Sequence, residues 1–210
     1  MKNKTTILST ILCLLPMVLS AAVYEKLPQQ VAVHFDISGN PDNYVPKVIA
    51  AFGIPLLLAI INLYTNFRVS KDPKVENASS SLRAITRWLV SLLSVIMVPV
   101  TLFGAMERKI PIIMLTTAIT GVVIVICGNY LPKCKQNYTI GIKLPWTLDN
   151  DDNWNRTHRF SGFVWVTGGF IIIINAFIQI PNLLTAVVIG LVLLPFLYSY
   201  LFYKSQKTQG

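Results

Sequence analysis

The most prominent pattern in the sequence is a series of long apolar runs separated by short polar segments. A helix rises about 1.5 Å per residue, so about 20 mainly apolar residues are needed to cross a bilayer core about 30 Å thick. Six runs meet this requirement without a charged residue in their interior. They lie at residues 5–23, 48–67, 88–106, 110–130, 160–180 and 181–203. We therefore predict an all-α integral membrane protein with about six transmembrane helices.

Prolines and asparagines interrupt the apolar character of these runs. Proline lacks the N–H that continues a helix, but membrane helices tolerate it because neighbouring groups satisfy the freed carbonyl. The prolines therefore predict kinks within the spans. They are Pro16, Pro55, Pro99 and Pro195. Asn62 and Asn175 are expected to form hydrogen bonds between helices, as polar side chains inside a bilayer commonly do.

The first run allows two interpretations. Lys2 and Lys4 precede it and small residues follow it at 20–22, an arrangement that also occurs in cleavable signal peptides. The apolar stretch is longer than the usual core of a signal peptide, which favours a retained span. Cleavage would leave the sidedness of the other spans unchanged.

Basic residues are distributed unequally between the two sides of the membrane. Loops on the side of the termini hold 14 Lys and Arg residues, and the alternate loops hold 4. Positive residues are retained on the cytoplasmic side. We therefore predict that both termini, a connector at 68–87 and the loop 131–159 are cytoplasmic, and that the loop 24–47 faces outward. The connector is short, polar and mixed in charge, so we expect it to be flexible.

The composition agrees with a lipid environment. The 210 residues are 53% hydrophobic and 13% charged, whereas soluble domains are about one quarter charged. In a soluble domain the net charge of +9 would suggest a nucleic-acid partner, but here the membrane topology accounts for the basic residues. We predict the lipid bilayer as a partner and no direct contact with nucleic acid.

The outward loop carries the pattern of a short strand. From Val31 to Ile37 apolar residues alternate with Ala32, His34 and Asp36, which is strand periodicity. Turn-forming residues follow at 38–42. The unit is interpreted either as a structural lid, since two strands must pack on something to be stable, or as a docking surface whose edge pairs with an extracellular peptide. The candidate ligand-binding residues are His34, Phe35, Asp36, Gly39 and Asp42.

The cytoplasmic loop combines an extended start with a helix start. Residues 138–144 alternate between larger apolar and smaller or polar side chains, and Pro145 interrupts the pattern. A helix is expected to begin within 147–152, with Asn150 or Asp149 as its cap and two acidic residues in its first turn.

This helix is expected to run into the fifth span with two paired faces. Trp154 and His158 are four residues apart and share a face, as do Asp152 and Arg156. Trp146 and Trp154 would lie at headgroup level, where indole rings are enriched.

An interfacial anchor with snorkelling arginine explains the aromatic and basic residues of this loop. It does not explain Gly141 or the turn at 145–147. The turn either braces the fourth span against the fifth or docks a soluble regulator. The candidate partner-binding residues are Asn137, Gly141, Lys143, Pro145, Trp146, Thr147, Trp154, His158 and Arg159.

Titratable residues are too few and too poorly spaced for catalysis. His34 and Asp36 outside, with Cys134 and His158 inside, make neither a metal site nor a nucleophile with its base. We therefore predict no enzyme activity, no metal and no cofactor. Ion-coupled carriers usually keep ionisable residues within their spans, and these runs have none. A small-molecule transporter or channel-like protein remains the alternative function.

Two sequence blocks resemble the SdpI family of bacterial membrane immunity proteins. Residues 27–47 resemble the outward loop of a small conserved domain found at the start of many such proteins. Residues 128–133, 137–148 and 154–162 resemble the family's signature. Where Lys143 and Leu144 stand, the family more often has arginine and threonine, and lysine does not fully replace an arginine that binds a carboxylate through two hydrogen bonds.

The resemblance implies an immunity protein of the bacterial cell membrane. Its partners would be a secreted peptide toxin on the extracellular side and a cytoplasmic transcriptional repressor held at the membrane once toxin is bound. It also implies an N-terminal two-span unit at 1–67 and a four-span SdpI-like domain at 88–210, joined by the connector.

Overall fold

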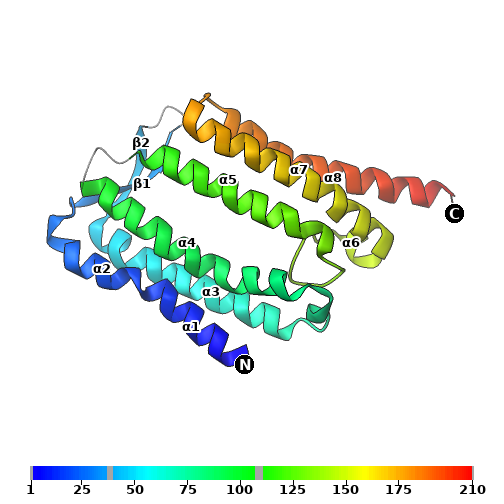
Figure 1. Ribbon diagram of the computed structural model, residues 1–210, viewed down its shortest axis with the longest axis horizontal. Coiled ribbons are helices and arrows are strands. Elements are labelled where there is room, and N and C mark those ends of the chain that lie inside the picture. Colours follow the sequence, from blue (N-terminus) through cyan, green and yellow to red (C-terminus); the bar gives the residue numbers. More distant parts are fainter. Residues whose placement is uncertain (1, 37–39, 107–110, 210) are drawn as a thin grey trace. The chain divides into compact units, whose positions relative to one another are not determined.

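The computed structural model describes residues 2–36, 40–106 and 111–209 (Figure 1). In this part of the chain, six helical segments are long and apolar enough to cross a membrane. They are Lys4–Lys26, Ile49–Lys71, Ser80–Met106, Ile112–Lys133, Asp151–Ile178 and Leu183–Thr208. The predicted all-α membrane fold is confirmed, and the protein is a multi-pass membrane protein.

Contacts divide the chain into two compact units. Unit 1 comprises Met1–Ser70 and Ala84–Ile113, and unit 2 comprises Lys71–Arg83 and Met114–Gly210. Each unit is therefore built from two separate stretches of sequence. The domain boundaries expected at 67 and 88 stay a prediction, because contacts group residues by proximity and not by evolutionary origin.

Unit 1 consists of the first three spans and a two-stranded sheet. Its elements are α1 (Lys2–Leu14), α2 (Pro16–Val23), the 3-10 turn η1 (Tyr24–Lys26), β1 (Gln30–Phe35), β2 (Pro41–Pro46), the π-helical turn η2 (Ile49–Gly53), α3 (Ile54–Lys71) and α4 (Ser80–Met106). The first residues of α4 belong to unit 2.

Proline alters the backbone of the first two spans. The first helix stops at Leu14 and restarts at Pro16, where a missing N–H costs little at the start of a helix. Pro55 is the second residue of α3, which directly follows η2. Pro99 and Pro195 lie inside α4 and α8 (Leu183–Gln209), which continue as helices through them.

The sheet is an antiparallel hairpin with an irregular end. Val31 pairs with Val45, and the register shifts on both sides of His34. The predicted strand is confirmed, but its strict alternation is not. Val31 is fully buried, whereas Phe35 is only half-buried, because an irregularity of this kind re-aims the side chains that follow it. Ile37 and Gly39 lie outside the described residues.

The hairpin packs on η2, which follows it in the sequence, and on the more distant α4. Val31 and Leu27 form a buried apolar cluster with Ala50 and Ala51 of η2 and with Val98 and Leu102 of α4. Isolated two-stranded units need such packing to be stable. The hairpin is therefore an integral part of unit 1.

Of the two asparagines predicted to join helices, Asn62 and Asn175, one does so. The Asn62 amide of α3 lies 2.9 Å from Ser9 Oγ and 3.1 Å from Thr10 Oγ1, both in α1, as predicted. Asn175 does not have the predicted role. Its Oδ1 accepts a hydrogen bond from the Ile180 N–H at 2.9 Å, so it caps the end of α7 (Asp151–Ile178).

Unit 2 consists of the last three spans and the polar segments beside them. Its elements are the 3-10 turn η3 (Val75–Asn77), α5 (Ile112–Tyr130), the 3-10 turn η4 (Leu131–Lys133), α6 (Pro145–Asp149), α7 and α8. In Figure 1, α7 and α8 run side by side.

Glycines allow α5 and α7 to approach closely. A Cβ added to Gly121 would lie 2.8 Å from the Gly169 carbonyl oxygen, and one added to Gly162 would lie 2.9 Å from the Gly128 carbonyl oxygen. Small residues at such contacts let membrane helices approach backbone to backbone. The atoms that an added Cβ would meet include backbone carbonyl oxygens, which cannot move away by a change of side-chain rotamer.

We predict that Gly169→Ala destabilises unit 2. Its Cβ would lie 2.9 Å from the Gly121 carbonyl oxygen and 2.6 Å from Val125 Cγ2, and overpacking typically costs about 1–3 kcal/mol. Thermal denaturation in detergent should show a lower midpoint. The matched control is Gly190→Ala in α8, whose Cβ meets nothing nearer than 4.0 Å. Equal midpoints for the two variants would contradict the close contact.

Candidate functional site

The segment between α5 and α7, residues 131–150, is here called the signature loop. Most of it has no regular secondary structure, so its backbone groups need other partners. The fully buried Asn137 supplies several of them. Its Oδ1 accepts from the N–H groups of Thr139 (3.0 Å) and Ile140 (2.6 Å), and its Nδ2 donates to the Lys135 carbonyl (3.0 Å).

His158 fastens the middle of the signature loop to α7. Its Nε2 accepts from the Ile142 N–H at 3.0 Å, and its Nδ1 lies 2.8 Å from the Trp154 carbonyl oxygen. Both bonds form when Nδ1 carries the proton and Nε2 is unprotonated. The Trp154 ring stacks on the imidazole at a centroid distance of 4.1 Å, and its Nε1 donates to the Cys134 carbonyl at 2.6 Å.

Gly141 is required where the loop crosses His158. Its φ is +112°, and a Cβ added there would collide with His158 Nε2 and lie 3.2 Å from the Trp154 ring. Only glycine adopts such a conformation readily. The glycine that an interfacial anchor did not explain therefore lets the backbone pass over the imidazole.

Thr147 organises the turn at 145–147. Its hydroxyl accepts from the Leu144 N–H at 2.9 Å and lies 3.0 Å from the Ile142 carbonyl oxygen. Pro145 begins α6, where its missing N–H costs little. The helix expected to begin within 147–152 is confirmed as α7, and α6 is an additional short helix before it. Asn150 caps α7 by accepting from the Asn153 N–H at 2.8 Å.

One expectation about this segment is wrong. Residues 138–141 form bends and residues 142–144 belong to no strand, because Asn137 and Gly141 turn the backbone. Trp154 is 0% exposed, so its ring packs in the interior of unit 2, and its position at headgroup level stays a prediction. The shared face of Trp154 with His158 is confirmed, as is that of Asp152 with Arg156, whose Nε lies 3.1 Å from the carboxylate.

Trp146 attaches α6 to α8. Its Nε1 donates to Ser199 Oγ at 2.7 Å, and its ring contacts the side chains of three aromatic residues. These are Phe196, Tyr200 and Tyr203. Ser199 also donates to Asn153 Oδ1 at 2.9 Å. Trp146 therefore braces the signature loop against the sixth span.

The residues between α3 and α4, 72–79, are here called the linker. It folds onto the signature loop, contrary to the expected flexible connector. Asp72 Oδ2 accepts from the Tyr138 N–H at 3.0 Å, Lys74 Nζ donates to Gln136 Oε1 at 2.6 Å, and Asn77 Nδ2 donates to the Gln136 carbonyl at 2.7 Å.

An apolar cluster accompanies these polar contacts. Ala78 of the linker and Leu82 of α4 are buried with Cys134, Ile140 and Trp154. Sequence reasoning missed Asp72 and Gln136 because their partners lie 66 and 12 residues away, respectively. The one available signal was the apolar pair Ala78 and Leu82, four residues apart.

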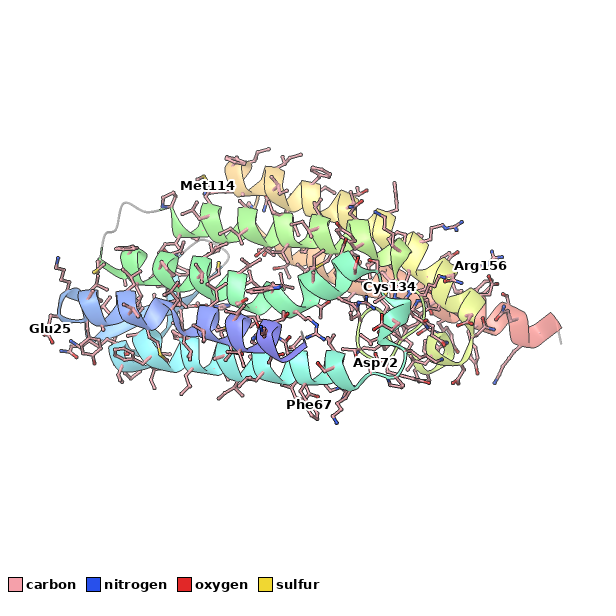
Figure 2. The ribbon with its side chains drawn as sticks, turned by 60° about the horizontal axis from the view of Figure 1, so that its bottom comes forward. Glu25, Phe67, Asp72, Met114, Cys134 and Arg156 are labelled. Atoms are coloured by element: carbon pink, nitrogen blue, oxygen red, sulfur yellow. The ribbon has the colours of Figure 1, made fainter. Side chains whose placement is uncertain are left out.

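Cys134 is shielded at the centre of this cluster. The pKa of its thiol is raised to about 11, chiefly by burial; a hydrogen bond from Asn137 acts to lower this pKa and the nearby Asp72 acts to raise it. The thiol therefore stays protonated at neutral pH and donates to the Ile140 carbonyl at 3.4 Å. Figure 2 shows Asp72 and Cys134 close to one another.

The hairpin presents a small polar group. His34 Nδ1 lies 2.6 Å from Asp42 Oδ1 across the two strands, and both side chains are exposed. Asp36 is held in the turn instead: its carboxylate accepts from the Asn40 N–H at 2.8 Å. The structure thus brings His34 and Asp42 together and gives Asp36 a structural contact.

Neither place has the arrangement of a metal centre. Within the described residues, no three His, Cys, Asp or Glu side chains are grouped so that they would hold a metal ion. The side chains of Asn137 and Thr147 are bonded to the backbone of the signature loop itself. What the geometry offers is a rigid polar loop in unit 2 and an exposed polar hairpin in unit 1.

Models of known protein families match both the signature loop and the hairpin. A model of the SdpI/YfhL protein family matches residues 133–199, and a model of a domain of unknown function (DUF1648) matches residues 11–59. Immunity protein SdpI of Bacillus subtilis (strain 168) is 29% identical over 206 residues, which cover 96% of this chain and 97% of that protein. The chain is thus similar to the SdpI/YfhL family over its C-terminal third and to Immunity protein SdpI over almost its whole length.

The match to SdpI extends across the contacts described above. The SdpI model begins at the end of η4 and ends at Ser199, so it contains both partners of the bond from Trp146 to Ser199. The second model covers β1 and β2. The linker, at 72–79, lies outside both matched ranges. No solved structure matches the chain.

We predict that Gly141→Ala disrupts the packing of the signature loop on His158. A side chain at φ +112° is strained and displaces His158, so the free energy of unfolding should fall by about 2–4 kcal/mol. A thermal melt in detergent measures the change. Lys143→Ala, two residues further on and exposed, is the control and should melt like the unaltered protein. A Gly141→Ala variant of normal stability would show that the crossing over His158 is not formed.

Proposed function

We propose that this protein protects the bacterium that makes it from a secreted antimicrobial peptide. One observation carries the proposal: the similarity to Immunity protein SdpI runs almost from end to end, so it includes both the hairpin and the signature loop. A protein that shared only the spans would support a membrane location and no more. Catalysis has no place in the proposal, because the SdpI/YfhL family is a family of immunity proteins.

The proposal includes an orientation. Since 14 of the Lys and Arg residues lie on the side of the termini and 4 on the other, both termini, the linker and the signature loop are cytoplasmic and the hairpin is extracellular. A toxin that arrives from outside then meets the hairpin first.

The hairpin is the proposed recognition element for the peptide. The ion pair between His34 and Asp42 is exposed, and exposed pairs contribute little to stability, so these side chains are available to a ligand. Phe35 is half-buried and Asp36 is held by Asn40, which makes them supports of the turn. A strand edge of this kind can pair with the backbone of an extended peptide.

The signature loop, together with Trp154, His158 and Arg159 at the start of α7, is the proposed output surface. Its residues are of two kinds, buried and exposed. Asn137, Thr147, Trp154 and His158 are fully or almost fully buried, so they act by fixing the loop. The exposed residues are the ones that a transcriptional repressor can touch. They are Lys143, Pro145 and Arg159. The hydrogen bond of Trp146 to Ser199 favours the brace over direct docking.

We predict that replacing His34 and Asp42 together by alanine lowers protection at least about tenfold, the effect of losing one or two polar contacts to a ligand. Sensitive cells that express each variant are exposed to a panel of purified secreted peptide toxins, and the minimal inhibitory concentration is measured. Membrane abundance should not change.

The control is Glu25→Ala with Lys26→Ala, which also removes one acidic and one basic side chain, both of them exposed and outside the hairpin. Before protection is scored, an Asn43→Cys variant is labelled in intact cells with an impermeant maleimide to establish that the hairpin is outside. Normal protection by the His34 and Asp42 variant would rule out the hairpin as the recognition element.

A further inference from the structure

Asp72 holds the linker and the signature loop together. It is only 7% exposed, and its two carboxylate oxygens accept backbone hydrogen bonds from different segments. Oδ1 accepts from the Lys74 N–H at 2.8 Å within the linker, and Oδ2 accepts from the Tyr138 N–H at 3.0 Å in the signature loop. A buried carboxylate is costly unless it has such partners. Moving the linker away would leave both the carboxylate and an N–H unsatisfied.

Gln136 extends this attachment to α6. Its Oε1 and its carbonyl accept from Lys74 and Asn77 of the linker. Its Nε2 donates to the carbonyls of Leu148 (2.6 Å) and Thr147 (3.3 Å) in the last turn of α6. The linker is therefore bonded, through one side chain, to the helix that carries Trp146.

The helices that the linker joins also carry the hairpin. Ala50 and Ala51, directly before α3, and Val98 and Leu102 of α4 form the apolar cluster around Val31. Ala50 is 21 residues from Lys71, the last residue of α3, which is roughly 30 Å of helix. The linker is thus the segment that joins the two helices that hold the hairpin.

We propose that the linker couples the hairpin to the signature loop. A change in the packing of Val31 alters how α3 and α4 are held, and the bonds of Asp72 and Asn77 pass this change to Tyr138 and Gln136. The coupling has two arrangements, linker attached and linker released, which both ends bias. It rests on the proposed function, since it describes how a ligand on the hairpin would reach the output surface.

Hydrogen exchange followed by mass spectrometry tests the coupling. The full chain is placed in lipid nanodiscs, and exchange is measured for a peptide that covers residues 138–144. Asp72→Ala should raise the exchange rate at least about tenfold, because a buried bond to a charged group is lost. The matched control is Glu76→Ala, which removes an exposed carboxylate of the same linker that pairs with Arg83. It should leave the rate within about twofold of normal, as expected for a surface pair.

A second pair of variants tests the connection to the hairpin. Val31→Ala should raise exchange at 138–144 severalfold, and it should add nothing further when Asp72 is already alanine. If the two effects multiply, or if Val31→Ala has no effect on this peptide, the linker does not couple the two sites. Should Asp72→Ala fail to fold, Asn77→Ala replaces it, with the same expectations and the same contradicting results.

The experiment uses no toxin, so its outcome is independent of immunity. Unchanged exchange would overturn the coupling and leave the protection proposal standing. If the protein gave no protection, the measured exchange rates would still support or contradict the coupling.

Discussion

The signature loop depends on the requirement that buried backbone groups find hydrogen-bond partners although no regular helix or strand provides them. Where water is scarce, an N–H or C=O without a partner costs several kcal/mol. Asn137 satisfies three such groups, and His158 and Thr147 satisfy others. Within the described residues, no buried side-chain nitrogen or oxygen lacks a partner. The loop is therefore held in one conformation by side chains that cannot be exchanged freely.

Because of this requirement, the residues that fix the conformation of the loop differ from those that a partner can touch. The buried residues of the loop determine its conformation, and the exposed ones, such as Lys143 and Pro145, are presented by it. The same division holds in unit 1, where Val31 anchors the hairpin and His34 with Asp42 forms its exposed group. Under the proposed function, we expect a substitution in the first class to alter stability and protection together, and one in the second class to alter only the binding of a partner.

Much of the fold follows from local patterns in the sequence. The spans are long apolar runs, the hairpin shows alternation with a turn cluster, and Asn150 precedes an acidic first turn, so each could be predicted from neighbouring residues. The contacts of the linker could not, because Asp72 and Tyr138 meet only after two spans have folded. The alternation at 138–144 was misleading for a related reason. Its period is typical of a strand, but among the described residues no strand pairs with it, and His158 and Asn137 bond to its backbone instead.

The central claim is that the signature loop is closed around a buried core, and the two adjacent thiol positions at 134 and 135 test it most directly. Cys134 is 2% exposed and its thiol has a raised pKa, whereas the side chain of Lys135 is exposed. The rate of maleimide labelling at pH 7.5 is measured for Cys134 and for a Lys135→Cys, Cys134→Ala variant, each as the single cysteine of the chain. We predict that Cys134 reacts at least about a hundredfold more slowly, and that the difference disappears after unfolding. Equal rates in the folded protein would contradict the account.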